Sequence, residues 1–180
     1  MFTGDEQMRI RRAKLEDAPG IAKVHVDSWR TTYKGIIPDN FLNNLSYENR
    51  TELWKRNITD ETNYIVVALN EMDEIIGFGT AGKRQENKEE HTGDLTSIYL
   101  LEEYQGKGIG KKLLKELFKH FKELGRKKIF VEVLEDNKTR YFYEYYGAKL
   151  VKKDQIKIGE EILNELIYEW DSVDDVMERL

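Results

Sequence analysis

Hydrophobic and polar positions recur with two different periods along the chain, and the changes of period divide it into strands and helices. Stretches of alternating or continuous β-branched and aromatic residues predict strands over 8–14, 63–69, 74–82, 94–101, 128–134, 148–158 and 161–170. Helical spacing predicts helices over 17–33, after Pro38, over 46–58, from the glycines at 106–110 to Gly125, and over 137–147. A polar stretch over 83–93 is expected to be an exposed loop.

The order of these elements predicts an α/β protein of the α+β type. Several neighbouring strands are joined by short turns, which favours a mixed, mostly antiparallel sheet over a doubly wound parallel one. The one strong βαβ crossover covers residues 94–134. We find no repeat or linker, so we expect a single domain over 1–180, with a core at about 8–170 and a short acidic C-terminal tail.

Composition narrows the possible functions. The 180 residues suit one domain, and there is neither a membrane-length apolar run nor the apolar centre of a signal peptide, so we expect a cytoplasmic location and no membrane partner. There is no cysteine, which excludes disulfides, thiolate metal sites and a cysteine nucleophile. The three histidines have no metal-ligand spacing, so no metal is expected.

Charge is distributed unevenly. The net charge is −5, yet residues 107–128 hold nine lysines and arginines against two glutamates. The negative total and the shortness of this strip argue against a nucleic-acid partner, whereas a local basic strip favours one compact anionic ligand.

Three glycines, Gly106, Gly108 and Gly110, stand at the predicted start of the helix after the strand 94–101. A helix start exposes unpaired N–H groups, and glycine allows close approach, so a phosphate is the natural ligand. The Walker pattern fails because Gln105 stands at its first glycine and Lys112 follows Lys111. The dinucleotide pattern fails because its last position is Lys111.

Two motifs fit a different family. Gln105–Gly110 reads Q-x-x-G-x-G, and the stretch NKTRYFYEYYG at 137–147 is similar to N-x-[AS]-R-x-F-Y-E-x-x-G, with Thr139 in place of Ala or Ser. The chain therefore resembles the GNAT superfamily of acetyl-CoA-dependent N-acetyltransferases, in pattern over about residues 8–170. The resemblance implies a sheet that splays apart at the acetyl-CoA site and is flanked by helices.

The resemblance also implies the residues that bind acetyl-CoA. Backbone N–H groups of the glycine loop would hold the pyrophosphate, and the backbone of the preceding strand would pair with the pantetheine arm. The residues carried over in this way are Ile98, Leu100, Gln105, Gly106, Lys107, Gly108, Ile109, Gly110, Lys111, Asn137 and Arg140. For Asn137 a helix N-cap is an equally good interpretation.

For catalysis, Tyr143 occupies the position of the family's tyrosine that protonates the departing CoA sulfur, although it could be a core aromatic. Asp94 is the candidate base or water relay, and an ordinary turn residue is the alternative. Strict alternation would place Asp94 on the same face as Thr96, Ile98 and Leu100.

The acceptor side is less defined. His25, Trp29 and Tyr33 recur every four residues and form one stripe, of which Trp29 and Tyr33 are the candidate acceptor-binding residues. Core packing is the alternative, and His25 is more readily a structural histidine than a base.

The expected reaction is direct attack of a primary amine on acetyl-CoA in a ternary complex, without a covalent enzyme intermediate and with a small amine as the favoured acceptor. A protein N-terminal or lysine amine, or a non-catalytic acyl-CoA-binding regulatory domain, stay open as alternatives. An exposed edge in the final strands would offer one route to a homodimer.

Overall fold

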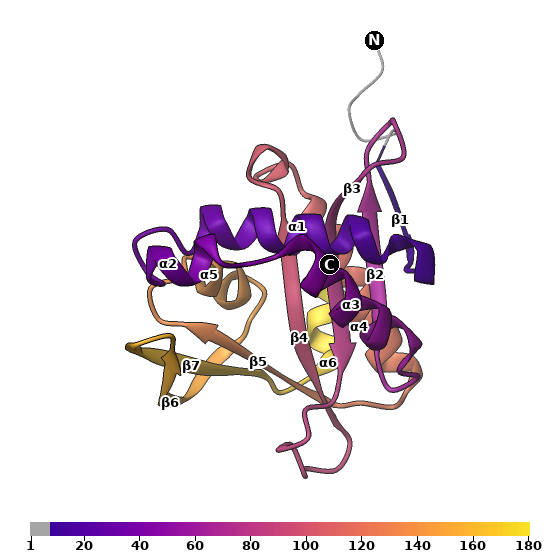
Figure 1. Ribbon diagram of the computed structural model, residues 1–180. Coiled ribbons are helices and arrows are strands. Elements are labelled where there is room, and N and C mark those ends of the chain that lie inside the picture. Colours follow the sequence, from indigo (N-terminus) through magenta and orange to yellow (C-terminus); the bar gives the residue numbers. More distant parts are fainter. Residues whose placement is uncertain (1–7) are drawn as a thin grey trace.

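The computed structural model describes residues 8–180 (Figure 1). Residues 1–7, which we included in the single domain and in the segment without a signal peptide, lie outside the described part. The strands are β1 (Arg9–Arg12), β2 (Tyr64–Leu69), β3 (Ile75–Gly82), β4 (Thr92–Leu100), β5 (Lys128–Leu134), β6 (Lys149–Ile158) and β7 (Glu161–Trp170). The helices are α1 (Ala18–Thr32), α2 (Asp39–Asn43), α3 (Tyr47–Thr59), α4 (Ile109–Glu123), α5 (Thr139–Tyr145) and α6 (Val173–Arg179).

The strands form one seven-stranded sheet in the order β1-β2-β3-β4-β5-β7-β6. β4 and β5 are parallel, with α4 as the crossover between them, and the other neighbouring strands pair antiparallel. This confirms the predicted mixed, mostly antiparallel sheet.

β4 and β5 stay together over only part of their length. Their pairing runs from Thr92↔Lys128 to Leu95↔Val131, whereas β4 continues to Leu100 against β3 and β5 continues to Leu134 against β7. The sheet therefore opens beyond Leu95 and Val131, and the edge of β4 that faces β5 is left without a strand partner there. The splayed sheet that the family resemblance implied is confirmed.

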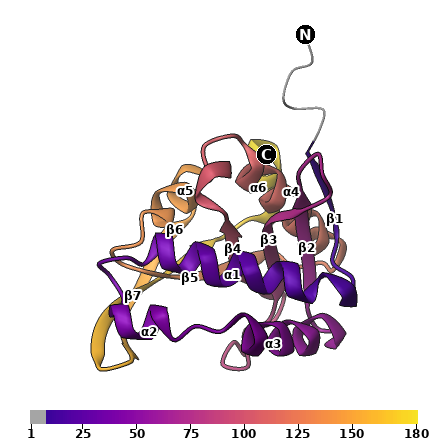
Figure 2. The same ribbon diagram turned by 45° about the horizontal axis from the view of Figure 1, so that its top comes forward.

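Helices cover both faces of the sheet (Figure 2), with α1, α2 and α3 on one face and α4, α5 and α6 on the other. The α4 face is packed with large apolar side chains such as Leu117, Phe121 and Trp170. Gly79 of β3 allows α4 to lie close, because a Cβ at that position would stand 2.7 Å from the Leu117 side chain. On the opposite face, Ile21 and Trp54 pack against Phe78.

The expected acidic C-terminal tail is instead the helix α6. Ser172 caps it by accepting a hydrogen bond from the N–H of Asp175 at 3.2 Å, and Val173 and Val176 are buried in the α4-side core. The acidic residues of its first turn are favourable there because the helix dipole is positive at that end. The core thus extends to the end of the described chain.

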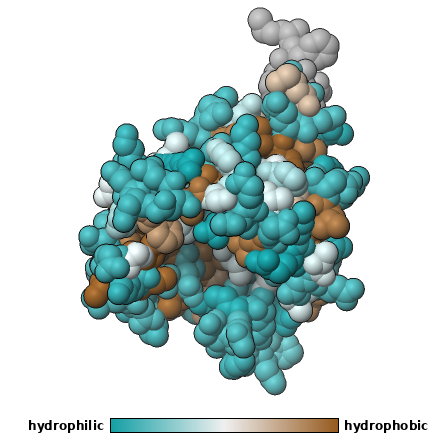
Figure 3. Space-filling model, in the orientation of Figure 1, coloured by the Kyte–Doolittle hydropathy of each residue, from teal (hydrophilic) through white to brown (hydrophobic). Residues whose placement is uncertain are grey.

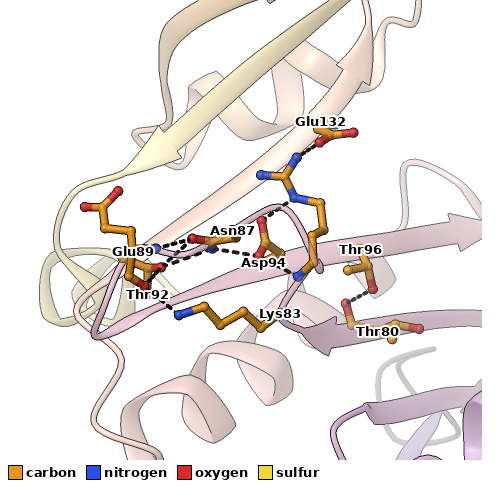
Figure 4. Close-up of polar contacts among 9 residues, drawn as sticks. Thr80, Lys83, Asn87, Glu89, Thr92, Asp94, Thr96 and Glu132 are labelled. Atoms are coloured by element: carbon orange, nitrogen blue, oxygen red, sulfur yellow. Dashed lines mark hydrogen bonds and ion pairs between the residues drawn. The ribbon is translucent and has the colours of Figure 1, made fainter. Parts of the chain in front are cut away.

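The expectation of strict alternation along β4 was also wrong. Ser97 stands opposite Thr80 and Leu95 opposite Ala81, so Thr96 is an extra residue in a β-bulge. Its hydroxyl donates to the carbonyl of Thr80 at 3.2 Å (Figure 4). The bulge puts Asp94 on the α1 face of the sheet and Ile98 on the α4 face.

Among residues 8–180 no helix is long and apolar enough to cross a membrane.

Candidate active site

The opening between β4 and β5 is lined by residues 95–99 of β4 and 131–133 of β5. Tyr33, the residue that follows α1, lines the opening on the α1 face. Tyr143 of α5 and Asn137 line it as well. Residues of both faces of the sheet line the opening, with Tyr33 and Tyr99 on the α1 face and Ile98 and Tyr143 on the α4 face.

Tyrosine hydroxyl groups gather in this opening. The Tyr33 and Tyr99 hydroxyls lie 3.0 Å apart, and Nδ2 of Asn137 donates to the Tyr33 hydroxyl at 3.4 Å. Burial raises the pKa of Tyr143, and the neighbouring Tyr33 hydroxyl adds to the rise. The Tyr143 hydroxyl makes no hydrogen bond within residues 8–180. Tyr143 is therefore a buried, protonated phenol that is available to donate its proton.

Packing fixes the ring of Tyr143. It lies edge-on to Trp170, with ring centroids 5.7 Å apart, and to its neighbour Phe142 at 5.9 Å. Asn137 fixes the start of α5, because its Oδ1 accepts a hydrogen bond from the N–H of Thr139 at 2.9 Å. Asn137 thus closes the turn that leads into α5, whose N-cap is Lys138 rather than Asn137, and its contact with acetyl-CoA stays a prediction.

The glycine loop leads from β4 into α4 on the α4 face. Gly106 and Gly108 have φ angles of +72° and +79°, which L side chains rarely adopt, and no atom of residues 8–180 lies within 4 Å of a Cβ built on either residue. No side chain caps the start of α4. The first N–H groups of the helix are therefore open to a ligand, and phosphate is the group that such a helix start favours.

Neighbours of the glycines have distinct roles. Ile109 is buried in the core, so its contribution to a ligand is its backbone N–H. The N–H of Gln105 donates to the carbonyl of Glu102 at 3.1 Å, and its Nε2 donates to the carbonyl of Leu100 at 3.2 Å. Gln105 thus joins the loop to β4, and the cradle of free N–H groups begins after it. Lys107 lies over the Tyr104 ring, 5.4 Å from its centroid, and Lys111 is exposed.

These residues fit the pantetheine and diphosphate parts of CoA. The edge of β4 at Ile98 and Leu100 can pair with amide groups, and it ends at the Gly106–Gly110 cradle. Arg140 lies on the surface of α5, where its guanidinium donates to the Tyr141 hydroxyl at 3.0 Å. Arg140 must give up its hydrogen bond to Tyr141 before its guanidinium can bind a phosphate.

Asp94 does not line the opening. Its carboxylate is 1% exposed and accepts hydrogen bonds from Nε of Arg84 at 2.6 Å, the N–H of Arg84 at 3.0 Å and Nδ2 of Asn87 at 2.9 Å (Figure 4). Both oxygens are thus occupied by protein donors, and the side chain is almost fully buried away from the opening. We therefore do not assign the base to Asp94.

The predicted aromatic stripe of α1 reaches the opening at one end. Trp29 packs against Tyr33 with ring centroids 4.8 Å apart, and Tyr33 makes the hydroxyl contacts described above. His25 is buried deeper, where its Nδ1 accepts a hydrogen bond from Nε1 of Trp54 at 2.9 Å. Burial, with a smaller effect of Arg50, lowers the pKa of His25 to about 4, so it is a neutral structural residue at pH 7.

Several residues of the opening were not found from the sequence. The sequence predicted ordinary strands around Tyr99 and Glu132 and an exposed loop around Arg84, so none of the three residues was singled out. Glu132 lines the opening and pairs with Arg84. The one available signal was that Glu132 is the only acidic residue in the strand 128–134.

Glu165 of β7 stands opposite Leu134 of β5, which places it on the α1 face near Tyr33. Burial raises the pKa of Glu165; Arg84 opposes this rise and Asp154 adds to it. Figure 3 shows this face, where hydrophobic side chains are recessed among hydrophilic ones.

These features together define the class of the protein, which binds acyl-CoA and transfers the acyl group. The chain belongs to the Acetyltransferase (GNAT) family, whose profile matches residues 26–148. It is similar to the uncharacterized N-acetyltransferase YuaI of Bacillus subtilis, with 39% identity over 161 residues that cover 89% of this chain and 91% of the relative. The protein is an acetyl-CoA-dependent N-acetyltransferase.

Two further comparisons concern ligands. The spermine/spermidine N(1)-acetyltransferase of Bacillus subtilis is 33% identical over 128 residues, which cover 66% of this chain and 84% of that relative. The crystal structure of the PaiA N-acetyltransferase from Thermoplasma acidophilum, in complex with coenzyme A, superposes with a TM-score of 0.71 at 25% identity and covers 88% of this chain and 97% of that one.

Proposed function

We propose that the protein transfers the acetyl group of acetyl-CoA to a primary amine of a small cationic acceptor, by direct attack in a ternary complex and without a covalent enzyme intermediate. The observation that carries the proposal is the buried side chain of Tyr143, which lines the opening between the parted strands β4 and β5. A proton donor in this place serves a leaving group that is bound along the free edge of β4.

For the donor substrate, the backbone N–H groups of residues 106–111 hold the diphosphate, with Lys107 and Lys111 close by. The backbone of Ile98 and Leu100 pairs with the pantetheine arm, and the Leu100 N–H faces the thioester carbonyl, where negative charge develops. Asn137 and Arg140 complete the donor site. Acetyl-CoA supplies the activated thioester, and the protein supplies its orientation and the proton transfers.

We assign the base to Glu132, because it is the carboxylate that lines the opening together with Tyr143. Glu132 takes a proton from the acceptor ammonium, directly or through one water. The amine lone pair then forms the bond to the thioester carbon, and the C–S bond breaks. Tyr143 gives its proton to the sulfur and regains one from the nitrogen as the amide forms, so one proton is released per turnover.

The charges beside the opening favour a cationic acceptor with a second ammonium. The Glu165 carboxylate makes no hydrogen bond or ion pair within residues 8–180, whereas neighbouring carboxylates on this face have cationic partners: Asp154 pairs with Lys152 and Glu169 with Lys128. A half-buried carboxylate without a partner is costly unless a cation meets it. The similarity to a spermine/spermidine acetyltransferase points to the same chemistry, so Trp29 and Tyr33 would flank the chain of a polyamine.

A thiol-release assay tests the proposal with acetyl-CoA and a panel of a monoamine, a diamine, spermidine and a peptide with a free N-terminus. We expect turnover with spermidine at the highest kcat/KM. Tyr143→Phe should lower kcat about tenfold or more while calorimetric CoA affinity stays within about twofold. Equal kcat values in the two proteins would remove Tyr143 as the acid, and a preference for the peptide would redirect the acceptor to a protein amine.

Glu165→Gln tests the acceptor class. It should raise the KM for spermidine about tenfold and leave the KM for a monoamine nearly unchanged, because only the polyamine has a second ammonium. Glu169→Gln removes a carboxylate on the same face of the same strand and serves as the matched control. An equal effect of both variants on both amines would contradict the role of Glu165.

A further inference from the structure

The Arg84 side chain lies where β4 and β5 part. The last paired residues of the two strands are Leu95 and Val131, and Glu132 is the next residue of β5. Arg84 forms an ion pair with Glu132 and also donates from Nε to Asp94 of β4 at 2.6 Å. One guanidinium group therefore joins a carboxylate on each strand at the point of separation (Figure 4).

A hydrogen bond to Asp94 holds the backbone of Arg84 in place as well. Its N–H donates to Oδ2 of Asp94 at 3.0 Å, and Nδ2 of Asn87 donates to the same oxygen at 2.9 Å. Asn87 is tied to β4 through Thr92, whose hydroxyl lies 3.1 Å from Nδ2. Because the guanidinium is planar, fixing Nε on a buried carboxylate also fixes the direction of the remaining N–H groups. Those groups point to Glu132.

We infer that Arg84 is a positioning residue for acetyl transfer, which holds the Glu132 carboxylate at the mouth of the opening where the acceptor amine arrives, and that Asp94 is the anchor of Arg84. The inference rests on the proposed role of Glu132. A carboxylate on an unrestrained side chain would sample several rotamers, and the loss of one fixed geometry for proton transfer costs rate more than binding. The role of Asp94 is then to orient the cation that orients the base.

A double-mutant cycle tests this inference. The proteins are wild type, Arg84→Gln, Glu132→Gln and the double variant, each assayed for thiol release with acetyl-CoA and spermidine or the best amine of the panel. We expect Arg84→Gln to lower kcat about tenfold or more with the KM for acetyl-CoA within about twofold. The same replacement in the Glu132→Gln background should change kcat by less than about twofold, because no carboxylate remains to be positioned.

Lys83→Gln is the matched control. Lys83 is the neighbouring residue in the same loop and donates to the carbonyl of Glu89 at 2.5 Å, away from the opening. Loss of its charge and contact should leave kcat unchanged. If Arg84 only secured the loop, the two variants would have similar kcat values, and Arg84→Gln would act equally in both backgrounds. Either result would overturn the inference.

Two more variants keep the test decisive. If Arg84→Gln does not fold, Asp94→Asn loosens the same guanidinium from its other side, and its effect on kcat should vanish in the Glu132→Gln background in the same way. Arg84→Lys keeps the charge but cannot bridge two carboxylates in a fixed geometry, so its kcat should stay well below wild type; full activity would contradict positioning. Full activity of Glu132→Gln would refute both the base assignment and the inference. An active wild type with an unchanged kcat in Arg84→Gln would refute the inference alone, and a wild-type protein inactive with every amine would refute the proposed function and the inference with it.

Discussion

Tyr143 and His25 are both buried, and burial changes their proton affinities in opposite directions. Removal from water disfavours the charged form, which is the phenolate for tyrosine and the imidazolium for histidine. The pKa of Tyr143 is therefore raised, and that of His25 is lowered to about 4. At neutral pH both are uncharged, so Tyr143 keeps the proton that the proposed mechanism requires, and His25 contributes no charge to the aromatic cluster that supports Tyr33.

The lowered pKa of His25 predicts a loss of stability in mild acid. The unfolded chain binds a proton at His25 near pH 6.5, and the folded protein does so only near pH 4. The unfolded state therefore holds more protons between these values, and the free energy of unfolding falls as pH decreases from about 6.5 to about 4. The full loss from this residue is about 3 kcal/mol. Urea unfolding between pH 4.5 and 7.5 measures the slope.

His25→Gln is the control for this prediction, because the glutamine amide oxygen can still accept the Trp54 N–H. The variant should be less stable at pH 7, and its unfolding free energy should fall less steeply with decreasing pH by about one proton. Carboxylates titrate in the same range in both proteins and cancel in the comparison. Parallel curves for the two proteins would show that His25 is not the group responsible.

At the scale of elements, the sequence predicted the segments that local pattern determines. The strand order of residues 63–101 and the helix from the glycines to Gly125 follow from hydrophobic period and from glycine, and both are present as β2, β3, β4 and α4. Tyr143 was located by motif register, and the structure places it in the opening.

Other features depend on contacts between distant segments, which a local pattern does not carry. The bulge at Thr96 is a property of the β3–β4 register, and it moved Asp94 to the other face of the sheet. Arg84 lies in a polar loop, and its proposed role depends on its ion pair with Glu132, which is 48 positions away in the chain. The short helix α6 had too few residues to show a period and is fixed by packing on α4.

The two ends of α4 offer a test of the glycine loop. Gly108 stands at its start with φ +79°, and Gly125 follows its end with φ +71°; each has open space around a Cβ. Gly108→Glu and Gly125→Glu therefore add the same side chain, the same charge and about the same strain, roughly 1 kcal/mol each. Gly108→Glu alone should abolish CoA binding, because a carboxylate would occupy the phosphate position.

Isothermal calorimetry with CoA and thermal unfolding of both variants make the comparison. We expect similar losses of stability and a loss of affinity of about 100-fold or more only for Gly108→Glu. If the two variants bind CoA equally well, the diphosphate is not held at the start of α4, and the cradle would have to be sought elsewhere.

At the scale of the whole molecule, the proposed sites of the two substrates lie on opposite faces of the parted sheet. The basic start of α4 lies on one face, and the carboxylates Glu132 and Glu165 lie on the other, with the opening between them. A protein of net charge −5 can thus attract an anionic donor and a cationic acceptor to different places. In the proposed mechanism the two substrates meet at this opening, so neither would have to leave before the other binds.

This arrangement predicts a sequential kinetic mechanism. Initial rates at several fixed acceptor concentrations should give double-reciprocal lines that intersect, because both substrates are bound when the acetyl group moves. Enzyme incubated with acetyl-CoA alone should show no stoichiometric gain of an acetyl group by intact-mass analysis. Tyr143→Phe should give the same mass result, which separates the loss of the acid from the loss of a nucleophile. Parallel lines together with one acetyl group per wild-type chain, absent in Tyr143→Phe, would instead make Tyr143 the nucleophile of a covalent mechanism.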